Sequence, residues 1–392
     1  MSSPHLPLSE LMRRPQDTLV RELLKLCGRP EVISFAGGLP ASEGFAVEAM
    51  RRAADEVLRQ MPVRALQYSY TEGDPILRQA IADFETSRGT PTSADEVMIV
   101  TGSQQAIDLI ARSFIDAGSR VLVENPTYMG ALQTFRNASP EFVPLPHDEE
   151  GLNPAAIDSS FAGARFAYVM PTYANPTGMT LSEERRIALC QKARELDLWL
   201  VEDDPYGELW YDKPAPKSLR HWAPERTLRL GTLSKTLAPG LRIGYVCGPK
   251  EALNVLSLLK QTCDLHTSTF AQLTAARVFT SGALEEHLPQ VRALYKRQAQ
   301  AMLEALEAHM PEGITWTRVE GGMFLWMTLP ETVNTTALFK RAIDAGVAFV
   351  PGQAFYAAGD DTHHMRLSFA TVPVDKIRTG VERLAGLLTC VL

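Results

Sequence analysis

The sequence predicts an α/β fold in which a mostly parallel central sheet is covered by helices on both faces. Short apolar, β-branched runs, typical of buried strands, occur at 97–100, 121–123, 166–169, 198–201, 228–230 and 243–246. Helical patterns separate several of these runs, and this alternation of strands with helices favours a parallel sheet. With 392 residues, the chain is long enough for two or three domains.

Two of the separating helices have recognisable ends. We expect the first to begin at Ser103, whose hydroxyl is a good N-cap, and to end before Gly118. Its apolar residues recur with the spacing of one helical face. We expect the second to begin near Thr180 to Glu184, where Thr180 and Glu183 match a capping box, and to run to about Glu195.

The pattern changes after about residue 283. A long helical pattern is followed by a strand at 323–327, a helix at 335–345 and strands at 347–350 and 365–369. This order predicts a smaller α/β domain at the C-terminal end.

The composition indicates a soluble, cytoplasmic protein. A formal net charge of −7 gives no general attraction to nucleic acid or to anionic lipid, so we expect neither partner. The five cysteines are scattered, without the spacing of a disulfide framework or a zinc site. The first ten residues lack the apolar core of a signal peptide, and no apolar run is long enough to span a membrane. His266, His363 and His364 have no spaced carboxylate or cysteine partner, so we expect no metal.

Polar residues follow four of the predicted strands. Thr101-Gly102-Ser103-Gln104 follows the strand at 97–100, Asn175 follows 166–169, Asp203 follows 198–201 and Lys235 follows 228–230. Open α/β sheets bind ligands beyond the carboxyl ends of their strands, so we expect these side chains to share one site. Each has an ordinary interpretation by itself, as a surface lysine, a turn residue or a loop residue. The prediction therefore depends on their joint order and spacing.

Three motifs together resemble the pyridoxal-phosphate (PLP) site of fold-type I enzymes in the aspartate aminotransferase superfamily. They are Asn175-Pro176-Thr177-Gly178, Asp203-Asp204-Pro205-Tyr206, and the segment from Gly231 to Gly244, which contains Lys235 and Arg242. Phe35 to Pro40 and Asp264-Leu265-His266-Thr267 are further shared segments, most similar to the 2-aminoadipate and kynurenine/aminoadipate aminotransferases.

The resemblance implies the three-layer fold of PLP-dependent transferases. It divides the chain into an N-terminal arm that joins the small domain (1–44), a large PLP-binding domain (45–285) and a small C-terminal domain (286–392).

The resemblance also implies a role for each residue around the cofactor ring. Lys235 would hold PLP as an imine and then carry the proton between substrate and cofactor. Asp203 would keep the pyridine nitrogen protonated, so that the ring withdraws electrons. Asn175 and Tyr206 would donate hydrogen bonds to the phenolate oxygen, and Tyr128 would stack on the ring.

The cofactor phosphate needs concentrated donors. The helix that opens at Ser103 and Gln104 offers free N–H groups and a favourable dipole, and Arg242 offers a bidentate guanidinium. Thr232 and Ser234 supply hydroxyl groups. Thr232 stands where relatives often carry serine, and the hydroxyl is retained.

Four further residues carry over from the resemblance. Tyr68 resembles the tyrosine that reaches the phosphate of the neighbouring subunit, which implies a homodimer with sites at its interface. Arg366 matches the arginine that binds the substrate α-carboxylate, and Gly38 the glycine beside that carboxylate. Arg21 is a candidate for recognising an acidic substrate side chain. The equal alternative is that Arg21 is an exposed arginine of a helix, paired with a glutamate.

The expected reaction is transamination from an L-α-amino acid to a 2-oxo acid such as 2-oxoglutarate. The donor stays open among 2-aminoadipate, glutamate, leucine and aromatic amino acids. A lyase, racemase or decarboxylase is the enzymatic alternative, although a carboxylate held by Arg366 argues against decarboxylation. A non-catalytic PLP-binding sensor is the other alternative, and we expect no room for its DNA-binding domain because the resemblance begins within about twenty residues of the start.

Overall fold

The structure, a computed structural model, describes residues 7–13, 31–359 and 361–392. Its centre is a seven-stranded sheet in the order β2-β10-β9-β8-β7-β3-β4, in which every strand except β10 runs in the same direction. The strands are β2 (Val97–Val100), β3 (Arg120–Val123), β4 (Glu141–Pro144), β7 (Phe166–Val169), β8 (Trp199–Asp203), β9 (Thr227–Thr232) and β10 (Gly244–Cys247). The predicted mostly parallel sheet is confirmed, with β4 as an additional edge strand.

Strand β10 is antiparallel to both of its neighbours because its connection from β9 is short. A parallel connection needs a crossover of a dozen or more residues, usually with a helix. The chain between Thr232 and Gly244 contains only a 3-10 turn at Pro239–Leu241. It therefore leaves β9 and enters β10 at the same edge of the sheet.

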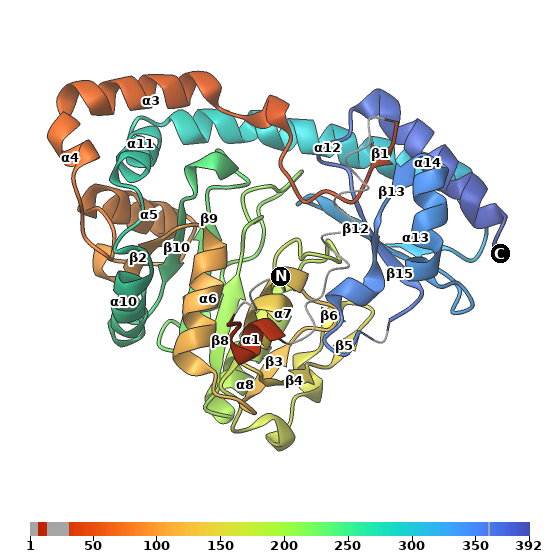
Figure 1. Ribbon diagram of the computed structural model, residues 1–392, viewed down its shortest axis with the longest axis horizontal. Coiled ribbons are helices and arrows are strands. Elements are labelled where there is room, and N and C mark those ends of the chain that lie inside the picture. Colours follow the sequence, from red (N-terminus) through yellow and green to blue (C-terminus); the bar gives the residue numbers. More distant parts are fainter. Residues whose placement is uncertain (1–6, 14–30, 360) are drawn as a thin grey trace, which may run out of the picture.

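Helices cover both faces of this sheet (Figure 1). We call the front the face on which Met98 and Val100 of β2 pack with α6, α7 and α10. The back is the opposite face, where Val97 and Ile99 pack with α5 and α11, and strands β3, β7 and β8 pack with α8. The front helices are α6 (Ser103–Phe114), α7 (Met129–Arg136) and α10 (Lys250–Asp264); the back helices are α5 (Pro75–Ser87), α8 (Glu183–Glu195) and α11 (Thr269–Thr280). Side chains alternate across a strand, so each strand serves both layers.

Two predicted helix caps are wrong by one or two residues. Helix α6 begins at Ser103, but its N-cap is Gly102, which has a φ of 77°. A Cβ atom at Gly102 would lie 2.4 Å from Nη2 of Arg242, so this position needs glycine. In α8 the side chain of Ser182, rather than Thr180, accepts the capping hydrogen bond from the backbone of Arg185.

The C-terminal part has its own sheet and core. An antiparallel sheet with the order β11-β12-β15-β14 packs against α13, α14 and the end of α12. The elements are α12 (Ala283–His309), β11 (Thr315–Trp316), β12 (Phe324–Thr328), α13 (Thr335–Asp344), β13 (Val347–Ala348), β14 (Val350–Pro351), β15 (His364–Ser368) and α14 (Val374–Thr389). Strand β1 (Ile33–Ser34) pairs with β13. This pairing supports the prediction that the N-terminal segment joins the small domain. The boundaries at 44 and 285 stay predictions.

Helix α12 links the two parts of the molecule. Its N-terminal Leu284 packs in the back core of the large sheet, whereas Met302 and Leu306 pack in the C-terminal core. In Figure 1 it runs along one side of both. The remaining helices are α1 (Glu10–Arg13), α3 (Val47–Gln60), α4 (Pro62–Leu66) and α9 (Leu219–Trp222), and β5 (His147–Asp148) and β6 (Gly151–Leu152) form a small hairpin.

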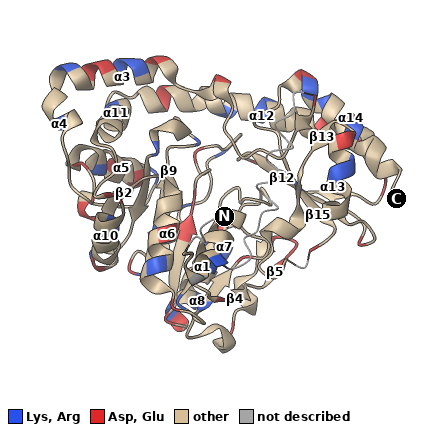
Figure 2. Ribbon diagram, in the orientation of Figure 1, with Lys and Arg blue, Asp and Glu red and all other residues tan. Residues whose placement is uncertain are grey.

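Charged residues of both signs are interspersed along the helices, α3 being an example (Figure 2). Within the described ranges, no helix combines the length and apolarity needed to cross a lipid bilayer.

Candidate active site

The carboxyl ends of β2, β7, β8 and β9 and the start of β10 meet at one edge of the sheet. The β9–β10 loop lies along this edge and carries Lys235 and Arg242. The turn after β8 begins at Asp203, the last residue of that strand. The predicted gathering of these side chains at a single edge follows from this topology.

Lys235 is a largely buried amine. Its Nζ donates a hydrogen bond to the carbonyl of Gly38 at 2.6 Å. Burial, followed by the positive charges of Arg366 and Arg242, lowers the pKa of Lys235 to about 8. A substantial part of this amine is therefore neutral near physiological pH, as a nucleophile requires.

Asp203 is buried and incompletely hydrogen-bonded. The hydroxyl of Tyr168 donates to Oδ2 at 2.6 Å, but Oδ1 has no hydrogen-bond partner among the described residues. Burial raises the pKa of Asp203 to about 7. A buried acceptor without a donor is costly, so this oxygen favours a ligand that brings one.

Arg366 connects the C-terminal sheet to the site. It is 2% exposed; Nη1 donates to Oδ1 of Asn175 and Nη2 to the carbonyl of Ala36, each at 2.8 Å. Its guanidinium lies 4.3 Å from the ring centroid of Phe324, and its Nε has no partner among the described residues. Burial lowers the pKa of Arg366 to about 10.

Two tyrosines lie beside these groups. Tyr206 is buried edge-on to Phe324, with ring centroids 5.6 Å apart. Burial raises the pKa of Tyr206, and a hydrogen bond with Asn175 opposes that rise. Tyr128 directly precedes α7, and burial followed by the charge of Asp203 raises its pKa. Both phenols therefore stay protonated and can donate hydrogen bonds.

The N-terminus of α6 forms the other end of the site. Arg242 has a left-handed backbone and donates from Nη2 to the carbonyl of Thr101 at 3.3 Å. The hydroxyl of Thr232 lies 3.0 Å from that of Ser234. The side-chain amide of Gln104 donates to Thr134 at 2.7 Å, so Gln104 can offer its backbone N–H rather than this amide to an anion at the helix end.

Together these residues fit PLP. The unpartnered oxygen of Asp203 suits a protonated ring nitrogen, and Lys235 suits the aldehyde. The helix N-terminus, with Arg242 beside it, suits a phosphate. We call the backbone of Gly102, Ser103 and Gln104 with Arg242 and the hydroxyls of Thr232 and Ser234 the phosphate cradle.

The structure separates some predicted residues from this cluster. Tyr68 is 77% exposed and contacts His266 edge-on, so its predicted role needs a second subunit. Gly38, in contrast, lies within the cluster, because its carbonyl accepts the hydrogen bond from Lys235. Arg21 lies outside the described residues.

The expectation that His363 and His364 lack a carboxylate neighbour is wrong. Asp361, close in sequence, brings Oδ1 to 2.5 Å from Nδ1 of His364 and 3.8 Å from Nδ1 of His363. The three ligand atoms lie within 4.8 Å of one another. Because Oδ1 already pairs with His364, which stacks on Trp326, we interpret the cluster as support for β15.

Sequence reasoning missed Tyr168, which orients Asp203, and Arg229, which contacts Asp204 on the back of the sheet. Both could have been recognised in the sequence, because each is a residue with a polar end within a mostly apolar strand.

Comparisons with known proteins agree with this site. A family model described as aminotransferase class I and II matches residues 30–384. The chain is 44% identical to aromatic-amino-acid aminotransferase 1 of Thermococcus litoralis, over 93% of this chain and 90% of that protein. It is 42% identical to 2-aminoadipate transaminase of Thermus thermophilus, over 96% and 94% respectively.

A kynurenine aminotransferase of Pyrococcus horikoshii, whose structure was solved in complex with PMP, superimposes with a TM-score of 0.94. The two are 42% identical, over 98% of this chain and 97% of that one. This likeness confirms the predicted transferase fold. The chain belongs to the class I and II aminotransferases and is a PLP-dependent enzyme of that family.

Proposed function

We propose that this aminotransferase acts as a homodimer that moves the amino group of an L-α-amino acid to a 2-oxo acid such as 2-oxoglutarate. The donors that we propose are 2-aminoadipate, glutamate, leucine and aromatic amino acids. Similarity to enzymes named for aromatic amino acids and for 2-aminoadipate supports these two donor classes, and the choice among the four stays open. The alternating use of donor and acceptor makes the mechanism ping-pong.

When PLP is bound, it supplies an electron sink for the substrate α-carbon. The chain's own residues bind, orient and move protons. The amine of Lys235, with its lowered pKa, accepts and returns the proton at the α-carbon. Asp203 would hold a proton on the ring nitrogen through Oδ1, which has no partner among the described residues. The phenol of Tyr206 would donate a hydrogen bond to the ring oxygen together with Asn175, and Tyr128 would support the ring face.

Arg366 orients the substrate. Its planar guanidinium is held between Asn175 and Ala36 and leaves Nε without a partner among the described residues. A carboxylate suits this fixed, buried donor group because a charge-assisted bond would compensate its desolvation. A carboxylate bound by Arg366 would be held in place and would not readily leave as carbon dioxide. This favours transamination over decarboxylation.

The observation that carries the proposal is that Lys235, whose pKa is lowered, and Asp203, whose Oδ1 has no hydrogen-bond partner among the described residues, lie at the same edge of the sheet. Mixing holoenzyme with a donor should convert its PLP absorption band to that of the pyridoxamine form, and 2-oxoglutarate should reverse the change. Lys235→Ala should slow this conversion at least about 1,000-fold, because it removes the proton carrier. Lys250→Ala, an exposed lysine on α10, serves as control. Release of carbon dioxide, or a band that 2-oxoglutarate never restores, would contradict the proposal.

Exposed apolar side chains support the homodimer. Val63, Leu66, Tyr68 and Tyr70 are between 65% and 80% exposed in the single chain. Such a concentration marks a protein contact, and it contains the tyrosine proposed to reach the partner's phosphate. Light scattering should give twice the chain mass, and Tyr68→Phe should weaken PLP binding without changing that mass. The proposed compartment is the cytoplasm.

Arg21 remains a proposed reader of acidic side chains. Arg21→Ala should lower the rate with 2-aminoadipate more than the rate with leucine. Equal losses for both donors would exclude this role.

A further inference from the structure

The end of α10 and the residues after it, Asp264 to Thr267, contact Thr101 and Gln105, which flank the phosphate cradle. Oδ2 of Asp264 accepts hydrogen bonds from the hydroxyl of Thr101 and from Nε2 of Gln105, both at 2.8 Å. The hydroxyl of Thr267 lies 3.0 Å from that of Thr101. Two residues of one short segment therefore meet on the residue that directly precedes Gly102.

A strained turn brings these two residues together. Leu265 has φ and ψ of 60° and −59°, and the N–H of His266 donates to the carbonyl of Asp264 at 2.7 Å. This is a γ-turn with positive φ, a rare and unfavourable conformation for a residue with a side chain. Such strain persists only where surrounding contacts determine it. Here these contacts include Thr101 and Gln105, and also Gln272, whose Nε2 donates to the carbonyl of Thr267 at 2.7 Å.

A buried lysine fixes the other oxygen of Asp264. Nζ of Lys260 donates to Oδ1 at 2.7 Å, and the side chain of Lys260 is fully buried. Hydrogen bonds and the charge of Lys260 lower the pKa of Asp264, although burial opposes this, so the carboxylate is ionised. Both of its oxygens are committed, which fixes its orientation.

Thr101 transmits this order to the cradle. Its backbone N–H donates to Oε1 of Gln105 at 2.7 Å, and its carbonyl accepts from Arg242 at 3.3 Å. Gln105 thus contacts Thr101 and Asp264 with the two ends of one amide. Movement of Thr101 would shift Gly102, the first turn of α6 and Arg242 together.

We propose that Asp264 is a positioning residue for the cofactor phosphate: it holds Thr101 and Gln105 so that the N-terminus of α6 and Arg242 converge on the anion. The inference rests on the phosphate cradle of the proposed function. Charge alone gives the opposite expectation, because removing a carboxylate near an anion site strengthens anion binding. The direction of the effect in a variant therefore separates positioning from electrostatics.

The test compares PLP with pyridoxal, which lacks the phosphate. The full chain, freed of cofactor, is titrated with each. The dissociation constant of pyridoxal divided by that of PLP measures what the phosphate contributes to binding. Asp264→Ala should weaken PLP binding about tenfold or more, because the two charge-assisted hydrogen bonds that hold Thr101 and Gln105 beside the cradle are lost. It should change pyridoxal binding less than about twofold, within the spread typical of a group that makes no contact. The ratio should fall accordingly.

Two further variants complete the design. Asp95→Ala removes the carboxylate of an exposed Lys250–Asp95 pair with an N–O distance of 2.9 Å, and it should leave the ratio unchanged. The double change Asp264→Asn with Lys260→Met keeps an oxygen for Thr101 and Gln105 and leaves no buried charge, so it should recover most of the ratio. Circular dichroism and thermal unfolding test whether each variant is folded.

Each outcome decides one question. A wild-type chain that binds pyridoxal as tightly as PLP would refute the phosphate cradle. A normal wild-type ratio that Asp264→Ala leaves unchanged or raises would overturn the role of Asp264. Equal weakening of both ligands would show that Asp264 acts on the fold alone and would also overturn it.

Discussion

Two consecutive carboxylates at the end of β8 lie in opposite environments on the front and back of the sheet. Asp203, on the front, has one oxygen without a partner among the described residues and a pKa raised by burial. Asp204, on the back, accepts from Arg229 at 2.9 Å and from the backbone of Gly207 at 2.7 Å. The hydrogen bonds of the aspartate on the front are thus incomplete, on the face where the cofactor would bind. Those of the aspartate on the back are formed, on the face that stabilises the fold.

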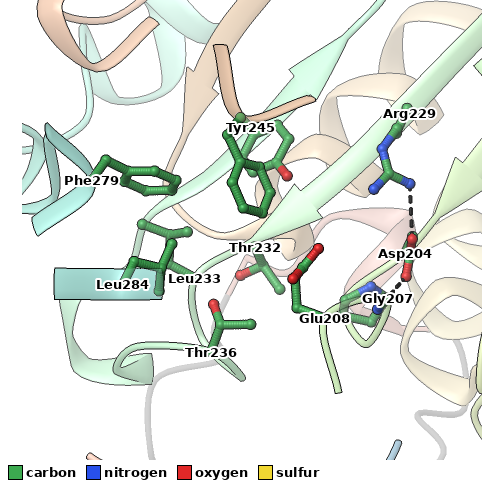
Figure 3. Close-up of a pocket in the computed structure, with 12 residues that line it drawn as sticks. Asp204, Gly207, Glu208, Arg229, Thr232, Leu233, Thr236, Tyr245, Phe279 and Leu284 are labelled. Carbon is green, nitrogen blue, oxygen red and sulfur yellow. Dashed lines mark hydrogen bonds and ion pairs between the residues drawn. The ribbon is translucent and has the colours of Figure 1, made fainter. Parts of the chain in front are cut away.

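The back of this edge carries a cluster of charged residues around Arg229, of which Figure 3 shows the pair of Arg229 and Asp204. Arg229 contacts Glu85 at 2.9 Å and Glu202 at 3.4 Å as well as Asp204, and it points into a small pocket lined also by Thr232 and Tyr245. Through Asp204 it holds the turn that presents Asp203 and Tyr206 to the front. The comparison predicts that front substitutions lower activity, whereas back substitutions lower stability.

The largest expected effect is on the front. Asp203→Asn should lower kcat about 100- to 1,000-fold, because the fixed charge opposite the ring nitrogen is lost. The free energy of unfolding of the cofactor-free chain should not fall. Since the pKa of Asp203 is raised to about 7, the stability contributed by its protonated form is present below about pH 4 and is lost as pH rises through 7. Asparagine removes that loss.

Asp204→Asn is the matched control, one residue away. It should lower the stability of the cofactor-free chain at pH 8, because Arg229 loses a partner, and should affect kcat less than the Asp203 change. Rate assays and thermal unfolding of both variants decide the matter. A destabilised Asp203→Asn chain would remove the distinction between the two faces.

The second effect is on the back. Arg229→Met should lower the free energy of unfolding by about 3 to 5 kcal/mol, because it leaves buried carboxylates without their cation. Urea denaturation measures this. Arg51→Met breaks an exposed pair with Glu48 and should not change stability measurably. If Arg229→Met unfolds at the same urea concentration as wild type, the back cluster does not stabilise the sheet.

The two faces also differ in how far the sequence predicts them. The front was predictable because its residues follow strands and form motifs with fixed spacing, as Asn175, Asp203 and Lys235 do. The back was not, because Arg229 and Glu85 are 144 positions apart and meet only through packing. An arginine between Leu228 and Leu230 was a signal, but nothing local identifies its partners.

Local chemistry alone also misplaced the cap of α6. Ser103 is the better capping side chain, yet the close approach of Arg242 requires glycine at position 102. Tyr168 belongs to the same class, since only the paired strands β7 and β8 bring it to Asp203. The sequence predicted the residues that would contact the cofactor. It did not predict residues such as Tyr168, which orient those residues.

The smallest expected effect concerns how the front sets its own charge. In the cofactor-free chain, Lys235 should be about 90% neutral at pH 9, given a pKa of about 8, whereas Asp95 raises the pKa of the exposed Lys250. Acetylation followed by peptide mapping should therefore show the rate at Lys235 levelling off near pH 9 while the rate at Lys250 still rises. Arg242→Gln should shift the Lys235 midpoint upward, because Arg242 is one of the charges that lower it. An unchanged midpoint would mean that burial and Arg366 set the pKa of Lys235 without Arg242. A shift would mean that a residue of the phosphate cradle also lowers the pKa of the nucleophile. The front, unlike the back, would then leave its positive charges without an anionic partner until the cofactor binds.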